Sequence, residues 1–351
     1  MAIRALLLAG GLLLTCGCAT PLSYLAKQGR HLLGDSLGAR SARSLLASGR
    51  TDSETRAFLV RAEEVRRFAS GRIGLQDNGN FTRYKQLDRD FLVSVVSACA
   101  VDSFAPYEWR YPVLGRLPYR GYYERTDADR EAARLKAEGW DVVVRPVDSF
   151  STLGFTRDPL YSFMKRYTAF ELASLILHEQ THATLFVKGQ TQFSEELASF
   201  VGDEGALAWL GETRGLESPE YRAALDELAD SQDYLALLRE LANALDREYR
   251  SPLSREQKLE WKDRLIAAFQ ADFEAGKREH FRTEYYRSLG APRVNNAYLS
   301  LYSLYSDDVP LIRSYWEKAC GGDLRRLLAD AKAMAKRGDV KEQMRRALAG
   351  S

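Results

Sequence analysis

The sequence predicts a predominantly helical α+β fold in which a small sheet precedes one amphipathic helix. Residues 217–285 are strongly helical and rich in charge, which indicates a long helical hairpin. Residues 140–147 and 150–155 are short apolar runs that predict strands. Apolar side chains then recur at helical spacing from residue 168 to residue 186, which predicts the helix that follows the sheet.

The sequence also indicates the secondary structure of four segments that precede these strands. Residues 51–70 carry apolar side chains at helical spacing, and residues 126–139 form a charged amphipathic helix that ends at a glycine. Residues 92–100 are mostly apolar, so periodicity does not decide between a buried strand and a helix segment. Proline and glycine punctuate the aromatic residues 109–123, which predicts a segment that is largely loop.

The second half of the chain is predicted to be helical. Asp158-Pro159 breaks the second strand, and a turn at residues 188–190 separates the helix at 168–186 from a further helix at 194–210. The hairpin is broken near Pro252. A polar and aromatic stretch at residues 295–305 then leads to closing helices.

The N-terminus reads as an export signal. Arg4 precedes an apolar run, residues 5–15, that is too short to span a bilayer. Small residues then lead to Cys16 and Cys18, which resembles a bacterial lipoprotein signal cut just before the cysteine that carries the lipid. We assign the lipid to Cys18, with Cys16 as the alternative. An ordinary secretory signal with incidental cysteines is the other interpretation.

A lipid on Cys18 would hold the protein at a membrane surface by acyl chains rather than by a helix. Alanine rather than aspartate follows Cys18, and by resemblance to Gram-negative lipoproteins we expect the outer membrane, with the body facing the periplasm. The chain then divides into a signal peptide at residues 1–17, a tether at 18–50 and a folded domain at 51–351. The helical C-terminal part of that domain starts near residue 211.

The balance of charges argues against one class of partner, and the cysteine content limits the possible disulfides. Lysine plus arginine, 50, nearly balances aspartate plus glutamate, 48, and no basic block is present, so nucleic acid is not an expected partner. Only Cys99 and Cys320 follow the signal, which permits one disulfide in an oxidising compartment. Cys99 lies in an apolar run, where a cysteine is more often a buried small residue.

Residues 178–182 read HEQTH and carry two of only four histidines in the chain. On a helix, residues i and i+4 share one face, so His178 and His182 could bind one metal ion with Glu179 beside it. This is the HExxH arrangement of zinc hydrolases, in which the histidines are ligands and the glutamate acts on the attacking water. The apolar lead-in and the acidic residues downstream favour a metal site over a chance match or a buried structural histidine.

A catalytic zinc site needs a third protein ligand and an open position for water. Glu195 and Glu196 lie near the start of the next predicted helix. Because consecutive helical residues point about 100° apart, only one of the two can face the metal. Spacing alone does not choose between them.

Several motifs in the same order resemble the predicted bacterial zinc aminopeptidase family, a group of exported lipoproteins of the glutamate-zincin type. They are HEQTH with the segment at 187–210, YRGYY at 119–123, STLGF at 151–155 before Asp158-Pro159, the GCAT start, and Asn295-Asn296-Ala297. The likeness covers nearly the whole mature chain and implies a zincin-like metallopeptidase core. It places the third ligand at Glu195, with Ser194 where the family usually has asparagine.

The resemblance implies a peptidase, and by the family name an aminopeptidase, with one zinc ion held by His178, His182 and Glu195. Glu179 would take a proton from the attacking water and deliver it to the leaving amine, as general base and then general acid.

The oxyanion of such a reaction needs a further hydrogen-bond donor. Related zinc peptidases supply it from a more C-terminal helix, where Tyr298, Tyr302 and Tyr305 are candidates. We favour Tyr302. The alternative for each tyrosine is an aromatic stripe packed in the core.

The expected partner is a peptide. The strand at 150–155 precedes the metal-binding helix as the substrate-pairing edge strand does in zincins, so it could hold an extended peptide by strand addition through Ser151, Thr152, Leu153 and Gly154. An aminopeptidase also needs a carboxylate that binds the substrate ammonium group. Glu196 and Glu124 are our candidates for this carboxylate. A zinc endopeptidase therefore stays open, and so does a non-catalytic envelope lipoprotein that keeps zinc for structure.

Overall fold

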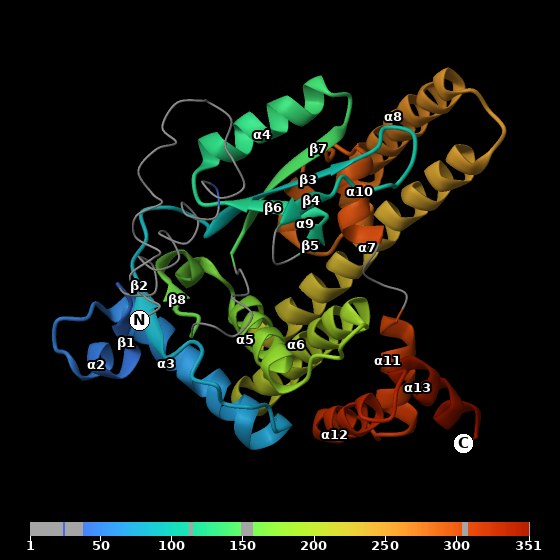
Figure 1. Ribbon diagram of the computed structural model, residues 1–351. Helices are drawn as coiled ribbons and strands as arrows, with labels where there is room; N and C mark the ends of the chain where they lie inside the picture. The colour runs from blue at the N-terminus through green and yellow to red at the C-terminus, as the bar shows by residue number, and fades with distance from the viewer. Residues whose placement is uncertain (1–23, 25–37, 112–114, 149–156, 304–307, 351) are drawn as a thin grey trace, which may run out of the picture.

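The computed structural model of the chain describes Tyr24 and residues 38–111, 115–148, 157–303 and 308–350 (Figure 1). Its strands are β1 (Arg40–Ser41), β2 (Arg83–Lys85), β3 (Val93–Cys99), β4 (Trp109–Tyr111), β5 (Gly115–Leu117), β6 (Tyr119–Tyr122), β7 (Asp141–Val147) and β8 (Leu160–Tyr161). Its helices are α2 (Ala42–Ala47), α3 (Ser53–Phe68), α4 (Arg125–Ala137), α5 (Ala169–Thr184), α6 (Thr191–Arg214), α7 (Pro219–Arg250), α8 (Arg255–His280), α9 (Glu284–Ser288), α10 (Asn296–Ser303), α11 (Val309–Lys318), α12 (Leu324–Ala335) and α13 (Val340–Ala349).

The predicted helices are confirmed, because their apolar periodicity runs over many turns. α3, α4, α5 and α6 lie within a few residues of the bounds expected from sequence. The long hairpin is α7 and α8, and it breaks where expected, between Arg250 and Arg255. Ser254 accepts a hydrogen bond from the backbone N–H of Gln257, which begins the second helix of the hairpin by capping it.

A three-stranded antiparallel sheet in the order β6-β3-β7 lies between helices. Every residue of β3 is buried, which resolves residues 92–100 as a strand. α4 covers one face of this sheet and α10 packs against β3 and β7 (Figure 1). The side-chain amides of Asn295 and Asn296 tie α10 to the sheet by donating to the backbone oxygens of Val142 and Ala100.

The expectation of a loop at residues 109–123 was wrong. The segment forms three short strands: β4 pairs with β5, and β6 pairs with β3. Gly115 opens β5 with a positive φ of 75°, Pro118 stands between β5 and β6, and Gly121 lies inside β6, where it pairs with Val95 of β3. The aromatic residues between them have high strand propensity, which outweighs the turn signal.

The folded body extends N-terminally beyond the expected boundary at residue 51. Leu45 is buried in the core, and Arg56 of α3 donates to the backbone oxygens of Leu46 and Ser48. Further upstream, the hydroxyl of Tyr24 donates to the backbone oxygen of Gly121 in β6, 2.6 Å away. Part of the segment expected to be a tether is therefore packed against the domain.

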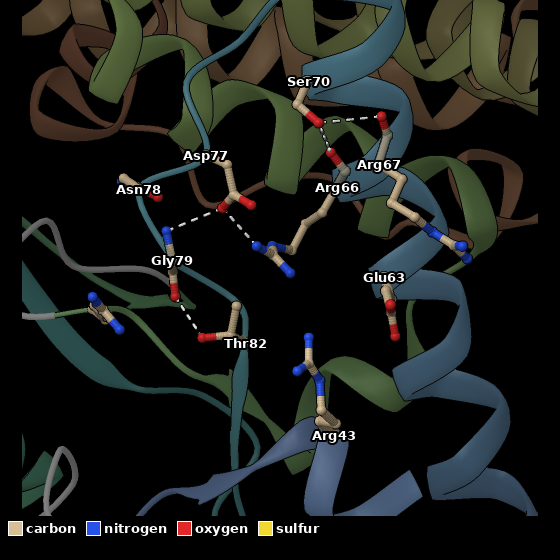
Figure 2. A pocket seen from close by; sticks show the side chains of 10 residues that line it. Arg43, Glu63, Arg66, Arg67, Ser70, Asp77, Asn78, Gly79 and Thr82 are labelled. Atoms are coloured by element: carbon tan, nitrogen blue, oxygen red, sulfur yellow. Dashed lines mark hydrogen bonds and ion pairs between the residues drawn. The ribbon is translucent and has the colours of Figure 1, made fainter.

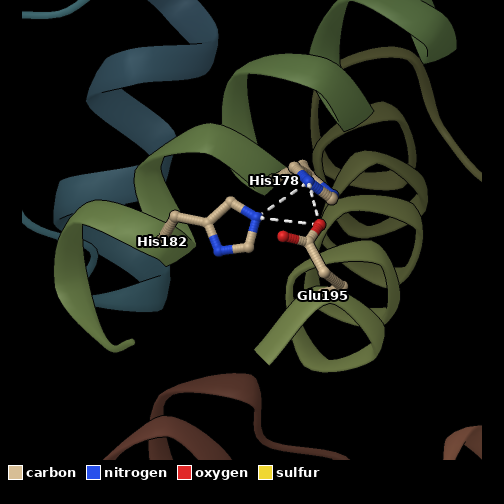
Figure 3. A group of neighbouring side chains, drawn as sticks. All are labelled: His178, His182 and Glu195. Carbon is tan, nitrogen blue, oxygen red and sulfur yellow. Dashed lines mark hydrogen bonds and ion pairs between the residues drawn. The ribbon is translucent and has the colours of Figure 1, made fainter. Parts of the chain in front are cut away.

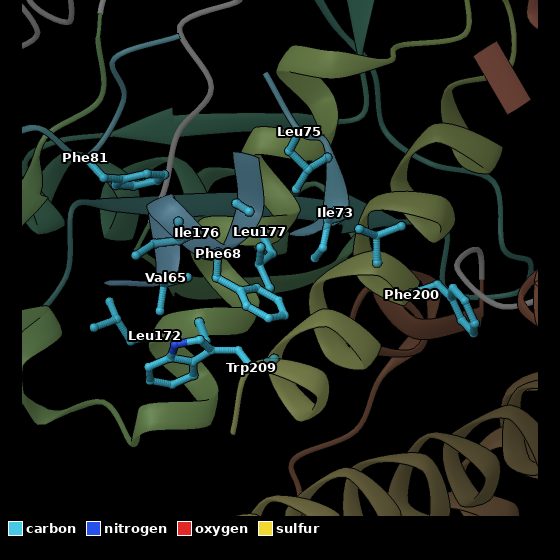
Figure 4. Packing of buried hydrophobic residues seen from close by; sticks show 14 of the residues in the cluster. Val65, Phe68, Ile73, Leu75, Phe81, Leu172, Ile176, Leu177, Phe200 and Trp209 are labelled. Atoms are coloured by element: carbon cyan, nitrogen blue, oxygen red, sulfur yellow. The ribbon is translucent and has the colours of Figure 1, made fainter. Parts of the chain in front are cut away.

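The main core forms where α3, α5 and α6 meet (Figure 4). Trp209 of α6 is almost completely buried against the apolar face of α5, which carries Leu172 and Ile176. α11, α12 and α13 add the closing side of this core. Burial of this many large side chains makes the α5–α6 pair a rigid support for the residues on its open face.

Both described cysteines, Cys99 and Cys320, are free and buried. The disulfide that the sequence permitted is therefore not formed, and Cys99 is the buried small residue expected in an apolar strand. Within the described ranges, no helix combines the length and apolar character needed to cross a membrane.

Candidate metal centre

α5 brings the two histidines of HEQTH to one face. Its first turn is fixed by a capping box: the Thr168 hydroxyl accepts from the backbone N–H of Glu171, and the Glu171 carboxylate accepts from that of Thr168. The opposite side of the helix is buried in the core. His178 and His182 are only partly buried, so their rings reach the open face of the helix.

The turn between α5 and α6 sets where the second helix begins. The Ser194 hydroxyl accepts from the backbone N–H of Val187 at 2.9 Å and donates to the backbone oxygen of Gln190 at 3.0 Å. The buried hydroxyl of Ser194 thus holds the turn closed by accepting one backbone hydrogen bond and donating another.

Gly202 lets α6 lie close to α5. A Cβ atom at this position would stand 2.9 Å from the backbone oxygen of Ser174 and 3.4 Å from the Cβ of His178. Only glycine fits such a backbone approach without displacing the helices. This close packing brings Glu195 of α6 to the histidines of α5.

His178, His182 and Glu195 point toward one another (Figure 3). The two Nε2 atoms are 3.0 Å apart. The Oε2 atom of Glu195 lies 3.7 Å from Nε2 of His178 and 3.4 Å from Nε2 of His182. The structure therefore brings together the three residues that the sequence predicted as ligands.

These positions fit a zinc ion. Ligands about 2.1 Å from a tetrahedral ion stand roughly 3.4 Å from one another, and the three observed separations lie on either side of that value. Two imidazole nitrogens and a carboxylate are also a donor set typical of catalytic zinc. His178 and His182 would hold the ion from α5 and Glu195 would hold it from α6.

The pKa shifts of the two histidines and of Glu195 bear on how these side chains could bind a metal cation. Burial lowers the pKa of His178, and the neighbouring charge of His182 acts in the same direction, so this imidazole is neutral and can donate an electron pair. The hydrogen bond with His182 holds the pKa of Glu195 below its ordinary value, although burial works against it. Burial would lower the pKa of His182, but the bond to Glu195 and its charge raise it overall.

Glu196 faces the other way. It is only 2 % exposed, and its carboxylate accepts from the side chain of Gln192 and from the backbone N–H of Asp308. The adjacent glutamates thus separate as the helical geometry requires: Glu195 turns to the histidines, and Glu196 anchors the segment before α11. Glu196 is accordingly a poor candidate for binding a substrate ammonium group.

Three neighbours of the centre were not assigned from sequence. Ser199 lies 3.4 Å from Nδ1 of His178 and can orient that ring. The ring of Phe186 lies 6.3 Å from that of His182, and this side chain is 54 % exposed. Tyr119 of β6 lies close enough to Glu195 for the carboxylate charge to add to the effect of burial and raise the tyrosine pKa.

Asp158 lies within electrostatic range of Glu179. Burial raises its pKa to about 7, and the charge of Glu179 acts in the same direction. Its backbone is held by Asn80, which accepts from the Asp158 N–H, and by Phe81, which donates to the Asp158 oxygen. The sequence marked Asp158-Pro159 as a strand break and as part of the family resemblance, but nothing local shows that the fold brings this carboxyl group into the range of the Glu179 charge.

The remaining predicted residues are Tyr302, which the structure describes, and several that lie outside the described residues. Tyr302 lies on α10, with its ring 5.0 Å from that of Tyr298, whose hydroxyl is 2.7 Å from that of Tyr234. None of the contacts of Tyr302 within the described part of the chain reaches the three ligands. Cys18, the predicted strand with Ser151, Thr152, Leu153 and Gly154, and Tyr305 lie outside the described residues.

A helix-borne HExxH pair joined by a glutamate from the next helix defines a candidate metal centre of the kind found in metallopeptidases. The family described as "Putative aminopeptidase" matches residues 23–348, and the chain belongs to that family. No curated protein and no solved structure matches the chain. Membership of this family supports a peptidase activity.

Proposed function

We propose that the protein is a zinc-dependent aminopeptidase that binds one zinc ion through His178, His182 and Glu195. The observation that carries this proposal is the spacing of the three donor atoms, which matches tetrahedral coordination, with Glu179 next to a ligand in the sequence. A zinc ion held in this way supplies a Lewis acid that polarises a peptide carbonyl and makes bound water more acidic.

Glu179 is the proposed general base and acid. It follows His178 on α5 and is partly exposed, so its carboxylate can accept a proton from the attacking water. The same group then returns the proton to the amine that leaves. A glutamine at this position keeps the shape of the side chain but cannot carry the proton.

Two tyrosines are proposed as donors to the oxyanion. Tyr302 is the candidate taken from the C-terminal position of the donor in related zinc peptidases. Tyr119 is the candidate from the structure, since the charge of Glu195 acts on its hydroxyl and its side chain is 41 % exposed. Removing each hydroxyl separately distinguishes them, because the true donor acts on kcat more than on KM.

We propose an extended peptide as the substrate, held by Ser151, Thr152, Leu153 and Gly154. Asp158 is our candidate for the group that binds the substrate ammonium. The charge of Glu179 acts on its carboxyl group, and a bound ammonium ion would favour the ionised form of Asp158. Loss of this group should raise KM for peptides with a free N-terminus and leave blocked peptides unaffected.

We also propose that the protein is exported and tethered through a lipid on Cys18 to the outer membrane, facing the periplasm. The basis is the signal-like N-terminus described above. Mass spectrometry of the mature N-terminal peptide tests the lipid anchor: an N-terminal, lipid-modified Cys18 supports it, and an unmodified N-terminus at another residue contradicts it.

Metal analysis and peptide hydrolysis by wild type and Glu179→Gln test the enzymatic proposal. We expect one zinc ion in both proteins and hydrolysis only by wild type. Zinc binding without cleavage of any peptide in a broad library would instead favour the non-catalytic lipoprotein. Cleavage of N-terminally blocked peptides as fast as free ones would favour the endopeptidase.

A further inference from the structure

A pocket of about 470 Å³ lies between α2, α3 and the loop that follows the π-helical turn Ala69–Ile73 (Figure 2). It is separate from the metal centre, since none of the three proposed ligands lines it. The guanidinium groups of Arg43 and Arg66 point into the same space, opposite Gly79 and Thr82. Arg67 and Arg157 also line the pocket, together with two acids, Glu63 and Asp77.

The lining has an excess of positive charge, with four arginines against two acids. Arg66 forms an ion pair with Asp77, at 2.6 Å. The other three arginines form no ion pair with any described residue. The Arg66 side chain is only 13 % exposed, and its Nε is buried without a hydrogen-bond acceptor in the described structure. Gathering like charges in this way is unfavourable unless an anion is present.

Hydrogen bonds hold the loop opposite α3 in place. Asp77 Oδ1 accepts from both Arg66 and the backbone N–H of Gly79, and the Thr82 hydroxyl donates to the Gly79 oxygen at 2.6 Å. Gly79 has a φ of 79°, and a Cβ there would stand 3.0 Å from Nε of Arg157. The glycine therefore makes room for the Arg157 guanidinium group at the wall of the pocket.

We propose that this pocket binds a phosphate group, as the dianion of inorganic phosphate or of a phosphomonoester. The planar fork of guanidinium donors matches tetrahedral oxyanions, and arginine is enriched where they are bound. A phosphomonoester carries a charge of about −1.5 to −2 at neutral pH, which balances the excess of the lining, whereas a single carboxylate would leave part of it uncompensated. The source is either a soluble phosphate or the headgroup of a phosphatidic-acid-type lipid.

Binding to the full chain in detergent tests the proposal independently of hydrolysis. The probes are inorganic phosphate, acetate at matched ionic strength, and short-chain phosphatidic acid with the corresponding diacylglycerol as its control. The variants are Arg43→Gln/Arg157→Gln, which removes two exposed arginines that form no described ion pair, and Arg110→Gln, an exposed arginine of β4 outside the pocket.

We expect phosphate to bind wild type and Arg110→Gln equally and the double variant at least tenfold more weakly, about 1.4 kcal/mol. Without phosphate, wild type and Arg110→Gln should unfold at the same temperature, and the double variant at the same or a higher temperature, because its pocket gathers fewer like charges. Binding of phosphatidic acid but not of inorganic phosphate, lost in the double variant, assigns the site to a lipid headgroup. The proposal is overturned if neither inorganic phosphate nor phosphatidic acid binds. It is also overturned if acetate or diacylglycerol binds as tightly as its phosphate counterpart, or if the double variant binds the phosphate probes as tightly as wild type.

Discussion

Gly202→Ala tests whether the packing of α5 against α6 sets the metal centre. The new Cβ would stand 2.9 Å from the Ser174 oxygen, about 0.5 Å closer than an ordinary carbon–oxygen contact. Because the obstacle is backbone, the helices must separate by a similar amount, carrying Glu195 away from the histidines. A metal site tolerates deviations of roughly 0.2 Å in its ligand distances, so this displacement exceeds what it can absorb.

Two effects of the substitution can be measured separately. Overpacking costs about 1–3 kcal/mol, partly offset by the roughly 1 kcal/mol that alanine gains over glycine in a helix. We therefore expect the metal-free protein to lose up to about 2 kcal/mol in denaturant unfolding. We expect zinc affinity, measured by competition with a chromophoric chelator, to fall at least tenfold, by analogy with the loss of groups that orient ligands.

Gly276→Ala is the matched control. Gly276 lies within α8, and nothing stands within 4 Å of the position its Cβ would take. That variant should gain about 0.5–1 kcal/mol of stability and bind zinc like wild type. If Gly202→Ala bound zinc as tightly as Gly276→Ala, the spacing of the two helices would not control the centre and the reasoning would be refuted.

Three further predictions concern the surroundings of the site. Of Tyr119→Phe and Tyr302→Phe, we expect the one that removes the oxyanion donor to lower kcat about 10²–10³-fold with little change in KM; equal, small effects of both would exclude both hydroxyls. Asp158 has a folded-state pKa raised to about 7, so its contribution to the stability of metal-free protein is present at low pH and is lost as pH rises towards 7. Asp158→Asn should therefore flatten the pH dependence of the unfolding free energy by roughly 1–3 kcal/mol between about pH 4 and 7, and an unchanged profile would contradict the assignment. Thr168→Ala removes the cap of α5 and should cost about 1 kcal/mol in denaturant unfolding, whereas no loss would show that the capping box is not stabilising.

The helices of this fold and its pair of histidines could be predicted from sequence because their signals are local. The HEQTH spacing places two imidazoles on one face whatever the rest of the chain does. The choice between Glu195 and Glu196 needed the family resemblance, and the structure gives its physical reason: Glu196 is bound to the segment before α11. Short strands such as β4 and β5 could not be predicted, because three residues carry too little periodicity to outweigh proline and glycine.

Contacts between distant segments had no signal in a single sequence. Asp158 comes within electrostatic range of Glu179, and Tyr119 within that of Glu195, only through the way the sheet and the loops pack beside α5 and α6. The arginine pocket is of the same kind, since its lining comes from α2, α3, a loop and the residue before Asp158. In the sequence, each of these arginines by itself has the character of an ordinary exposed charged residue.

Zinc binding by Glu195→Gln and Glu196→Gln tests the central claim most directly. Both changes remove one negative charge from neighbouring positions of α6, but only Glu195 faces the histidines. We predict one zinc ion per chain in wild type and in Glu196→Gln at equal affinity, and a loss of affinity of roughly 100-fold or more in Glu195→Gln. Wild-type affinity in Glu195→Gln, or a loss confined to Glu196→Gln, would contradict the assignment of the metal centre.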